Sequence, residues 1–111
     1  MDTLQELQRW YHAQCNGDWE HRYGVEIGAL DNPGWRVVID LVNTDWEDRP
    51  FTEVRRLEPE ADRIHCRIRE SKWEGYGGPF MLEEILRTFL SWAAVRRHCM
   101  AGECESVAGS Q

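Results

Sequence analysis

The 111-residue sequence lacks long apolar runs, and it lacks the cysteine spacing of metal-binding or disulfide-rich proteins. No stretch approaches the ~18 consecutive apolar residues that suggest a membrane span. The first residues, MDTLQELQRWYH, show neither the basic start nor the apolar segment of a signal peptide. The four cysteines contain no CxxC pair and are too sparse for a disulfide framework. We therefore expect free thiols and a cytoplasmic location.

Basic residues are also scarce. Thirteen Lys and Arg residues stand against twenty Asp and Glu residues, which gives a formal net charge of -7. Such a surface repels nucleic acids and anionic membranes and attracts cationic partners. The length suits one compact domain with a core of its own. We assign residues 1–98 to this domain and expect residues 99–111 to form a frayed tail.

Two amphipathic helices are predicted near the ends of the chain. The apolar stripe of the first comprises Leu4, Leu7 and Tyr11. The Asn16–Gly17 pair is suited to end this helix. Segment 79–98 predicts the second helix, with Pro79 at its first position. Its apolar stripe comprises Leu82, Ile85, Leu86, Phe89 and Ala93.

Strands are predicted between the two helices, because the apolar residues there alternate with polar ones. The predicted strands lie at 25–29, 35–41, around 51–58 and around 63–70. In the stretch LDNPGW, Pro33 and Gly34 suit the two central positions of a type II turn. This turn would join the first two strands as a hairpin.

These elements predict an α+β fold. A sheet with alternating faces needs a layer over its apolar side, and two terminal helices can supply it. We therefore expect a two-layer sandwich, in which an antiparallel meander sheet of four or five strands is flanked by an N-terminal and a C-terminal helix. The other face, with Glu26, Arg36 and Asp40 and the valines 38 and 42, would look outward or toward a partner.

The stretch QCNGDWEHRYG combines acids, a histidine and aromatic residues. For a metal, His12, Cys15 and His21 are the nearest set, but they lack the spacing of a four-ligand zinc site. For catalysis, Asp18, Glu20 and His21 could act as acid and base, but no nucleophile, phosphate-binding or metal motif accompanies them. We assign no catalytic residue, no metal ligand and no cofactor.

Six tryptophans are many for a chain of this length. Three lie on the predicted helices or on an inward strand face, and we expect them in the core: Trp10, Trp35 and Trp92. The other three lie among acids in predicted loops or at strand ends: Trp19, Trp46 and Trp73. A loop tryptophan with a charged rim is typical of an interface hot spot, but packing over the edge of the core explains it equally well.

The chain resembles the immunity protein 53 family of bacterial polymorphic toxin systems over the string WYHAQCNGDWEHRYGVEIGALDNPGWRVVIDL, from Trp10 to Leu41. The later strings GGP and LEEILRTFLSWA extend the resemblance as far as Ala94. Its most specific parts are QCNGDWEH.YG and LDNPGW. The segment VNTDWEDRP and the part after His98 carry little of it.

The resemblance implies a small cytoplasmic protein without enzyme activity that binds and neutralises a cognate toxin domain. The family motif covers residues 16–21, 23–24 and 31–35. We interpret part of it as structural, since backbone geometry explains much of this part without a partner. The structural residues are Asn16, Gly17, Asn32, Pro33, Gly34 and Trp35.

We interpret the chain as an immunity protein that binds its toxin stoichiometrically through an acidic surface containing tryptophan. The candidate contacts are Asp18, Trp19, Glu20, His21, Asp45, Trp46, Glu47 and Asp48. Residues 18–21 form either a local polar network or part of the toxin-facing surface, and the acidic loop 45–48 is the other candidate for contact. Two alternatives stay open: a small hydrolase or lyase that uses Glu20 and His21, and a small-ligand sensor module.

Overall fold

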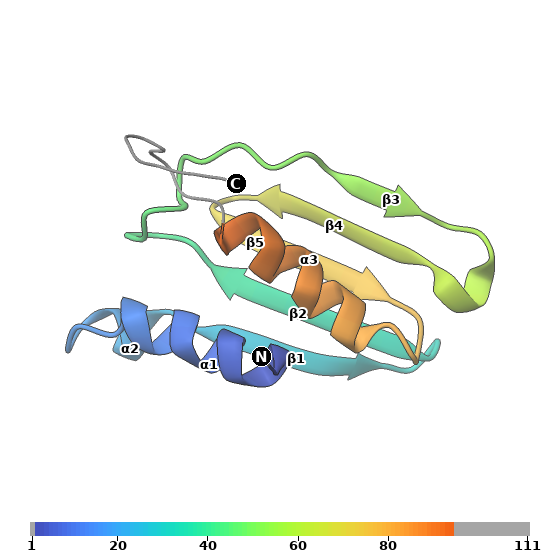
Figure 1. Cartoon of the computed structure of the whole chain (residues 1–111), viewed down its shortest axis with the longest axis horizontal. Coiled ribbons are helices and arrows are strands. Elements are labelled where there is room, and N and C mark those ends of the chain that lie inside the picture. Colours follow the sequence, from blue (N-terminus) through green and yellow to red (C-terminus); the bar gives the residue numbers. More distant parts are fainter. Residues whose placement is uncertain (1, 95–111) are drawn as a thin grey trace.

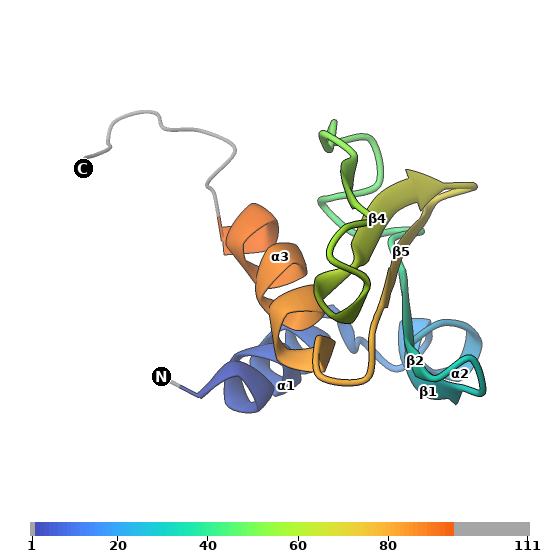
Figure 2. The ribbon, with the colours of Figure 1, turned by 90° about the vertical axis from the view of Figure 1, so that its right-hand side faces the viewer.

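The structure, a computed structural model, describes residues 2–94. An antiparallel five-stranded sheet forms one layer, and two long helices lie together on one of its faces (Figure 1, Figure 2). These helices are α1 (Thr3–Gln14) and α3 (Leu82–Ala94), and a single helical turn, α2 (Trp19–Arg22), precedes the sheet. The predicted α+β arrangement with terminal helices is confirmed.

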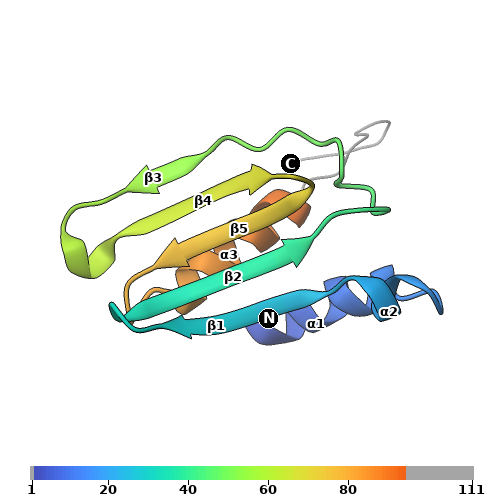
Figure 3. The same cartoon turned by 180° about the vertical axis from the view of Figure 1, so that it is seen from behind.

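The strand order differs from that of a simple meander. The strands are β1 (Val25–Leu30), β2 (Gly34–Asp40), β3 (Val54–Arg56), β4 (Ile64–Arg69) and β5 (Lys72–Gly77), with a short 3-10 helix, η1 (Glu60–Asp62), before β4. They are arranged as β1-β2-β5-β4-β3. After β2 the chain therefore crosses to the far edge of the sheet, and β5 later inserts beside β2 (Figure 3).

Glycines explain why β5 has a weak strand pattern. A Cβ atom on Gly75 would lie 2.5 Å from Cγ2 of Ile85. One on Gly77 would lie 2.9 Å from Cβ of Met81. Glycine at these positions lets the segment around α3 approach the sheet closely, but it also removes the apolar alternation by which a strand is recognised.

The core lies between the two long helices and the inner face of the sheet. Its fully buried residues include Val37, Ile39, Leu41, Ile64, Cys66, Trp73, Ile85, Leu86 and Phe89. The predicted stripe of α3 and the predicted inward residues of β2 and β4 account for most of them. In α1 only Leu7 and Trp10 are buried, while Leu4 is 54% and Tyr11 37% exposed. The predicted stripe of α1 is therefore too wide, because this helix lies at the edge of the helical layer.

The turn between β1 and β2 is not the predicted type II turn. The Asn32–Pro33 peptide bond is cis, and among residues 2–94 Gly17 is the one glycine with positive φ. A Cβ atom on Gly34 would overlap the carbonyl oxygen of Gly77. Gly34 is therefore required by the close approach of β5 and not by a left-handed backbone.

The start of α3 also differs from the prediction, because Pro79 lies before the helix. The carbonyl oxygen of Met81 accepts the first helical bond, from the Ile85 amide at 2.9 Å. The residues predicted near the end of this helix, Arg96, Arg97 and His98, lie outside the described residues, as do Cys99, Cys104 and the predicted tail. In the described part of the chain, no helix combines the length and the apolar character needed to cross a membrane.

Candidate functional site

A cluster of aromatic rings joins the two segments that contain the candidate contacts. Trp10 of α1 meets Trp19 and Trp46 edge to face, with ring centroids 6.2 and 5.6 Å apart. Trp19 begins α2, and Trp46 lies in the loop after β2. Trp10 also contacts Phe89 of α3, at 5.0 Å. The core therefore holds both segments at one end of the molecule.

Two side chains fix the corner between α1 and α2. The side-chain oxygen of Asn16 accepts the backbone amides of Asp18 and Trp19, each at 2.9 Å. In return, the Glu20 carboxylate accepts the amides of Asn16 and Gly17, also at 2.9 Å. Such a reciprocal arrangement satisfies the free donors at the start of a helix, as in a capping box. These bonds form the local polar network that is one of the two alternatives for residues 18–21.

Hydrogen bonds from backbone amides hold the pKa of the Glu20 carboxyl below its ordinary value of 4.5. Its own backbone amide lowers the pKa most and desolvation opposes this, while the amides of Asn16 and Gly17 and the charge of His21 lower it further. Both carboxylate oxygens accept backbone amides. This engagement suits a structural role for Glu20 and gives no support to its use as an acid or base.

Trp19 is a core residue, which corrects its place among the candidate contacts. Its side chain is 2% exposed, and its indole N–H donates to the carbonyl oxygen of Val42 at 2.9 Å. The single turn of α2 points Trp19 inward onto Trp10, since it is the one large apolar residue of this turn. Asp18 and His21 are exposed beside it, and Asp18 pairs with Arg22 at 3.4 Å.

The other tryptophans also divide differently from the prediction. Trp73, expected in a loop or at a strand end, is the second residue of β5 and is fully buried. Trp35 and Trp92, expected in the core, are half-buried at its rim, where each indole N–H donates to a backbone carbonyl oxygen at 2.9 Å. How far each tryptophan is buried depends on which distant element covers its ring. The position of the residue within its own helix or strand does not reveal that element.

The loop after β2 is shaped by its own side chains. The Thr44 hydroxyl donates to the Leu41 carbonyl oxygen at 2.8 Å and accepts the Trp46 amide at 3.1 Å. The Glu47 carboxylate accepts the amide of Asn43 at 3.1 Å, and Asn43 has a left-handed φ of 63°. Asn43 and Thr44 were not among the candidate residues. Asn and Thr both favour turns, and this preference is the sequence signal by which the two residues could have been identified.

Trp46 lies at the boundary between the core and the solvent. It is half-buried, and its indole N–H donates to the carbonyl oxygen of Ala93 at 3.2 Å. Its neighbours Asp45 and Asp48 are exposed. Of the four candidate residues in this loop, Glu47 thus closes the loop, Trp46 packs partly on the core, and the two aspartates present carboxylates to the solvent.

The two candidate segments lie at the same end of the molecule, where α2 and the loop after β2 are neighbours (Figure 1). The bond from the Trp19 indole to Val42 links them directly. We call the exposed carboxylates Asp18, Asp45 and Asp48 the acidic end surface. The structure therefore brings together residues that are separated by the whole first hairpin.

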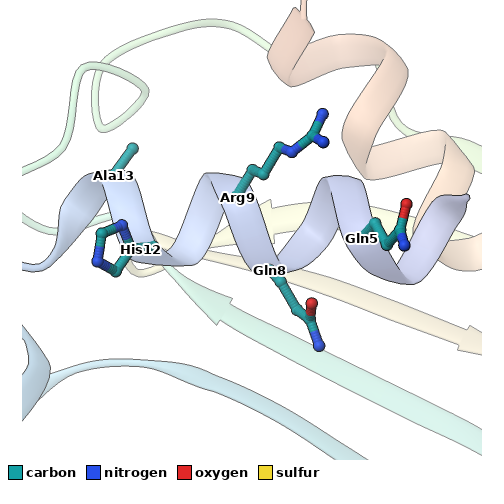
Figure 4. Close-up of a pocket in the computed structure, with 5 residues that line it drawn as sticks. All are labelled: Gln5, Gln8, Arg9, His12 and Ala13. Carbon is teal, nitrogen blue, oxygen red and sulfur yellow. The ribbon is translucent and has the colours of Figure 1, made fainter. Parts of the chain in front are cut away.

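A hollow lies along the side of α1 that faces away from the core (Figure 4). The described residues that line it are Gln5, Gln8, Arg9, His12 and Ala13. It contains neither Glu20 nor His21. Within residues 2–94, no three His, Cys, Asp or Glu side chains are grouped as metal ligands would be. This hollow therefore does not contain the acid–base pair of the enzyme alternative.

The outer face of the sheet carries cross-strand ion pairs. These are Arg36 with Glu26 at 3.6 Å, Lys72 with Asp40 at 3.7 Å, and Arg67 with Glu74 at 3.0 Å. The register confirms that Glu26 and Arg36 face outward. Val38 is on the same face but only 6% exposed, because it lies between Glu26 and Glu74 of the neighbouring strands. The charges of this face are largely balanced within the molecule.

The model of a family described as Immunity protein 53 matches residues 4–94 of the chain. The match includes the whole sheet, nearly all of both long helices and the tryptophan cluster. No curated protein and no solved structure matches the chain.

Proposed function

The chain belongs to the immunity protein 53 family, and we propose that it neutralises a cognate toxin domain of a bacterial polymorphic toxin system by binding it in a stoichiometric complex. Membership of the family supports an immunity role and a protein toxin as the partner. It also favours a role without turnover. The engagement of Glu20 by backbone amides is consistent with this, because it gives that carboxylate a structural task.

We place the contact at the acidic end surface and the neighbouring Trp46. This choice rests on one observation: the Trp10 ring contacts both Trp19 and Trp46. These contacts place the acidic segments 18–21 and 45–48 at the same end of the molecule. A surface fixed by the core loses little conformational entropy on binding. The net charge of -7 favours a toxin surface of positive charge.

Trp46 also packs on the core, and this structural role must be distinguished from a role in binding. A tryptophan beside exposed carboxylates suits the centre of an interface, but this ring also packs on Trp10 and bonds to Ala93. Replacement by alanine should therefore be followed in two assays. A binding role predicts faster toxin dissociation, with a loss of about 2 kcal/mol or more. A purely structural role predicts a lower melting temperature and unchanged dissociation.

The decisive experiment is a charge reversal at the two exposed aspartates of this loop. The double variant Asp45→Lys with Asp48→Lys removes two exposed carboxylates, and it spares Glu47, which closes the loop. Binding kinetics to the co-encoded toxin domain are measured at low salt and at about 0.15 M salt. Association at low salt should slow about tenfold or more, and its salt dependence should weaken, since screening acts over a Debye length of ~8 Å at 0.15 M.

A matched control changes the same charge at the opposite end of the molecule. Glu58→Lys with Asp62→Lys also replaces two exposed acids, one just before η1 and one at its end. This variant should change association much less than the first one. Equal slowing of association by the two variants would mean that only the net charge, and not the acidic end surface, determines the rate. Unaltered kinetics of the first variant would mean that the toxin binds another surface.

A further inference from the structure

Within residues 2–94, strand β1 is a free edge of the sheet, with β2 on one side and no described strand on the other (Figure 3). In an antiparallel pair, alternate residues direct their backbone groups toward the partner strand. The Asp40 amide donates to the Gly24 carbonyl oxygen at 3.0 Å, which sets the alternation for residues 24–30. The backbone groups of Val25, Ile27 and Ala29 therefore point to the free edge.

This edge lacks the features that usually prevent strand pairing between molecules. Natural edge strands tend to be short, charged, or interrupted by proline or a bulge. The opposite edge strand, β3, follows this rule with three residues, two of which are arginines. β1 has six residues, Glu26 as its single charge, and an unbroken register with β2.

An apolar side chain is exposed at the same edge. Residues 2–94 contain five exposed large hydrophobic residues, and one of them, Ile27, belongs to β1. Ile27 is 39% exposed although it shares the inner face of the sheet with buried residues of β2. α1 lies on the β1 side of the helical layer (Figure 1). Apolar exposure beside unpaired backbone groups is typical of a docking edge.

We propose that β1 pairs with β1 of a second copy of this chain, so that two sheets become one continuous sheet. With Ile27 on the twofold axis, the unpaired backbone groups of the two strands bond to each other. Ile27 then meets its own equivalent, and Val25 lies opposite Ala29 of the second copy. Such isologous pairing uses one surface twice, as the commonest homodimers do. It does not depend on the toxin proposed above.

The charge and shape of β1 favour this register and this occupant. Glu26 would lie opposite Gly28 of the second copy, so the carboxylates do not meet. A Cβ atom added to Gly28 has no neighbour within 4 Å. The space beside Gly28 can therefore hold the Glu26 side chain of the second copy. There it would lie next to Arg36, the cross-strand neighbour of Gly28 in the first copy. A register with Glu26 on the axis would set this carboxylate opposite itself, and like charges in that position are destabilising.

Sedimentation of the full chain over a wide concentration range tests the pairing. The mass should rise with concentration from 13.1 kDa toward twice that value. Ile27→Lys sets two ammonium groups against each other at the axis and should raise the dimer dissociation constant by about tenfold or more. The control Leu57→Lys makes the same change at a residue that is 53% exposed and outside β1. It should leave the dissociation constant unchanged.

A pair of substitutions at Gly28 tests the register. Gly28→Glu should weaken the dimer, because the new carboxylate faces Glu26 of the second copy, whereas the uncharged Gly28→Gln should weaken it much less. Hydrogen exchange of the Val25, Ile27 and Ala29 amides should slow as concentration rises. A mass of one chain at all concentrations into the millimolar range would overturn the proposal, as would equal behaviour of the two Gly28 variants. A monomeric chain whose toxin binding is weakened by Ile27→Lys would assign the edge to a toxin strand instead.

Discussion

Replacing Phe89 by alanine tests the contact on which the two layers depend. Phe89 is 0% exposed. Its ring meets those of Trp10 and Trp73 edge to face, at centroid distances of 5.0 and 5.3 Å. Residues of α1, β5 and α3 thus pack on one another through this side chain, and its removal leaves a cavity between the sheet and both helices.

The expected loss follows from the burial of this ring. Truncation of a buried Phe to Ala removes about 3 to 5 kcal/mol, through the lost transfer free energy and the cavity. We expect a value in the upper part of this range, because edge-to-face pairs add about 0.5 to 1.5 kcal/mol each beyond their buried area. A loss of 3 kcal/mol in a domain of about 100 residues lowers the melting temperature by about 12 °C or more.

Urea unfolding followed by tryptophan fluorescence measures the free energy of unfolding, provided that the slope with denaturant is unchanged. Phe80→Ala is the matched control, because Phe80 is 90% exposed and its loss should stay within about 0.5 kcal/mol. Phe89→Leu keeps part of the contact and extends the series if the alanine variant does not fold. A loss below about 1 kcal/mol for Phe89→Ala would refute the place of α3 over the sheet.

Two further predictions concern Gly34 and Glu20. Gly34→Ala should lower the free energy of unfolding in urea by about 1 to 3 kcal/mol, since its Cβ atom would overlap the Gly77 carbonyl oxygen. Gly28→Ala enters open space and should be nearly neutral, so equal losses would contradict this reason. Because the Glu20 pKa is lowered by folding, its ionised form stabilises the fold fully above pH 4.5, and this contribution is lost as the pH falls through the folded-state pKa. The difference in unfolding free energy between the wild type and Glu20→Gln should shrink below pH 4.5, and a constant difference would argue against the capping role.

Elements with a regular apolar period could be predicted from residue order. The stripe of α3, including Ile85 and Phe89, is buried as its helical spacing predicts. The alternation of β2 and β4 likewise predicts the burial of Val37, Ile39 and Ile64. These patterns are local, because a helix or strand with one apolar face must bury that face wherever it packs.

The corner at residues 16–20 was predictable in part for the same reason. An amide side chain at position 16 and a carboxylate at position 20 lie within reach of nearby backbone amides. Short sequence separation therefore sufficed to suggest a local polar network. The burial of Trp19 was not predictable, because it depends on Trp10 and Val42, which come from two other segments.

Residue order alone determined the α+β composition, the two terminal helices and the acidic character of the chain, since each follows from local periodicity or from the sum of charges. Only the tertiary structure decided the insertion of β5 between β2 and β4, the need for glycine at position 34 and the meeting of two acidic segments around Trp10. All three depend on contacts between residues far apart in the chain. Strand pairing and ring packing across such distances reflect which surfaces fit together in space, and a one-dimensional pattern does not contain that information.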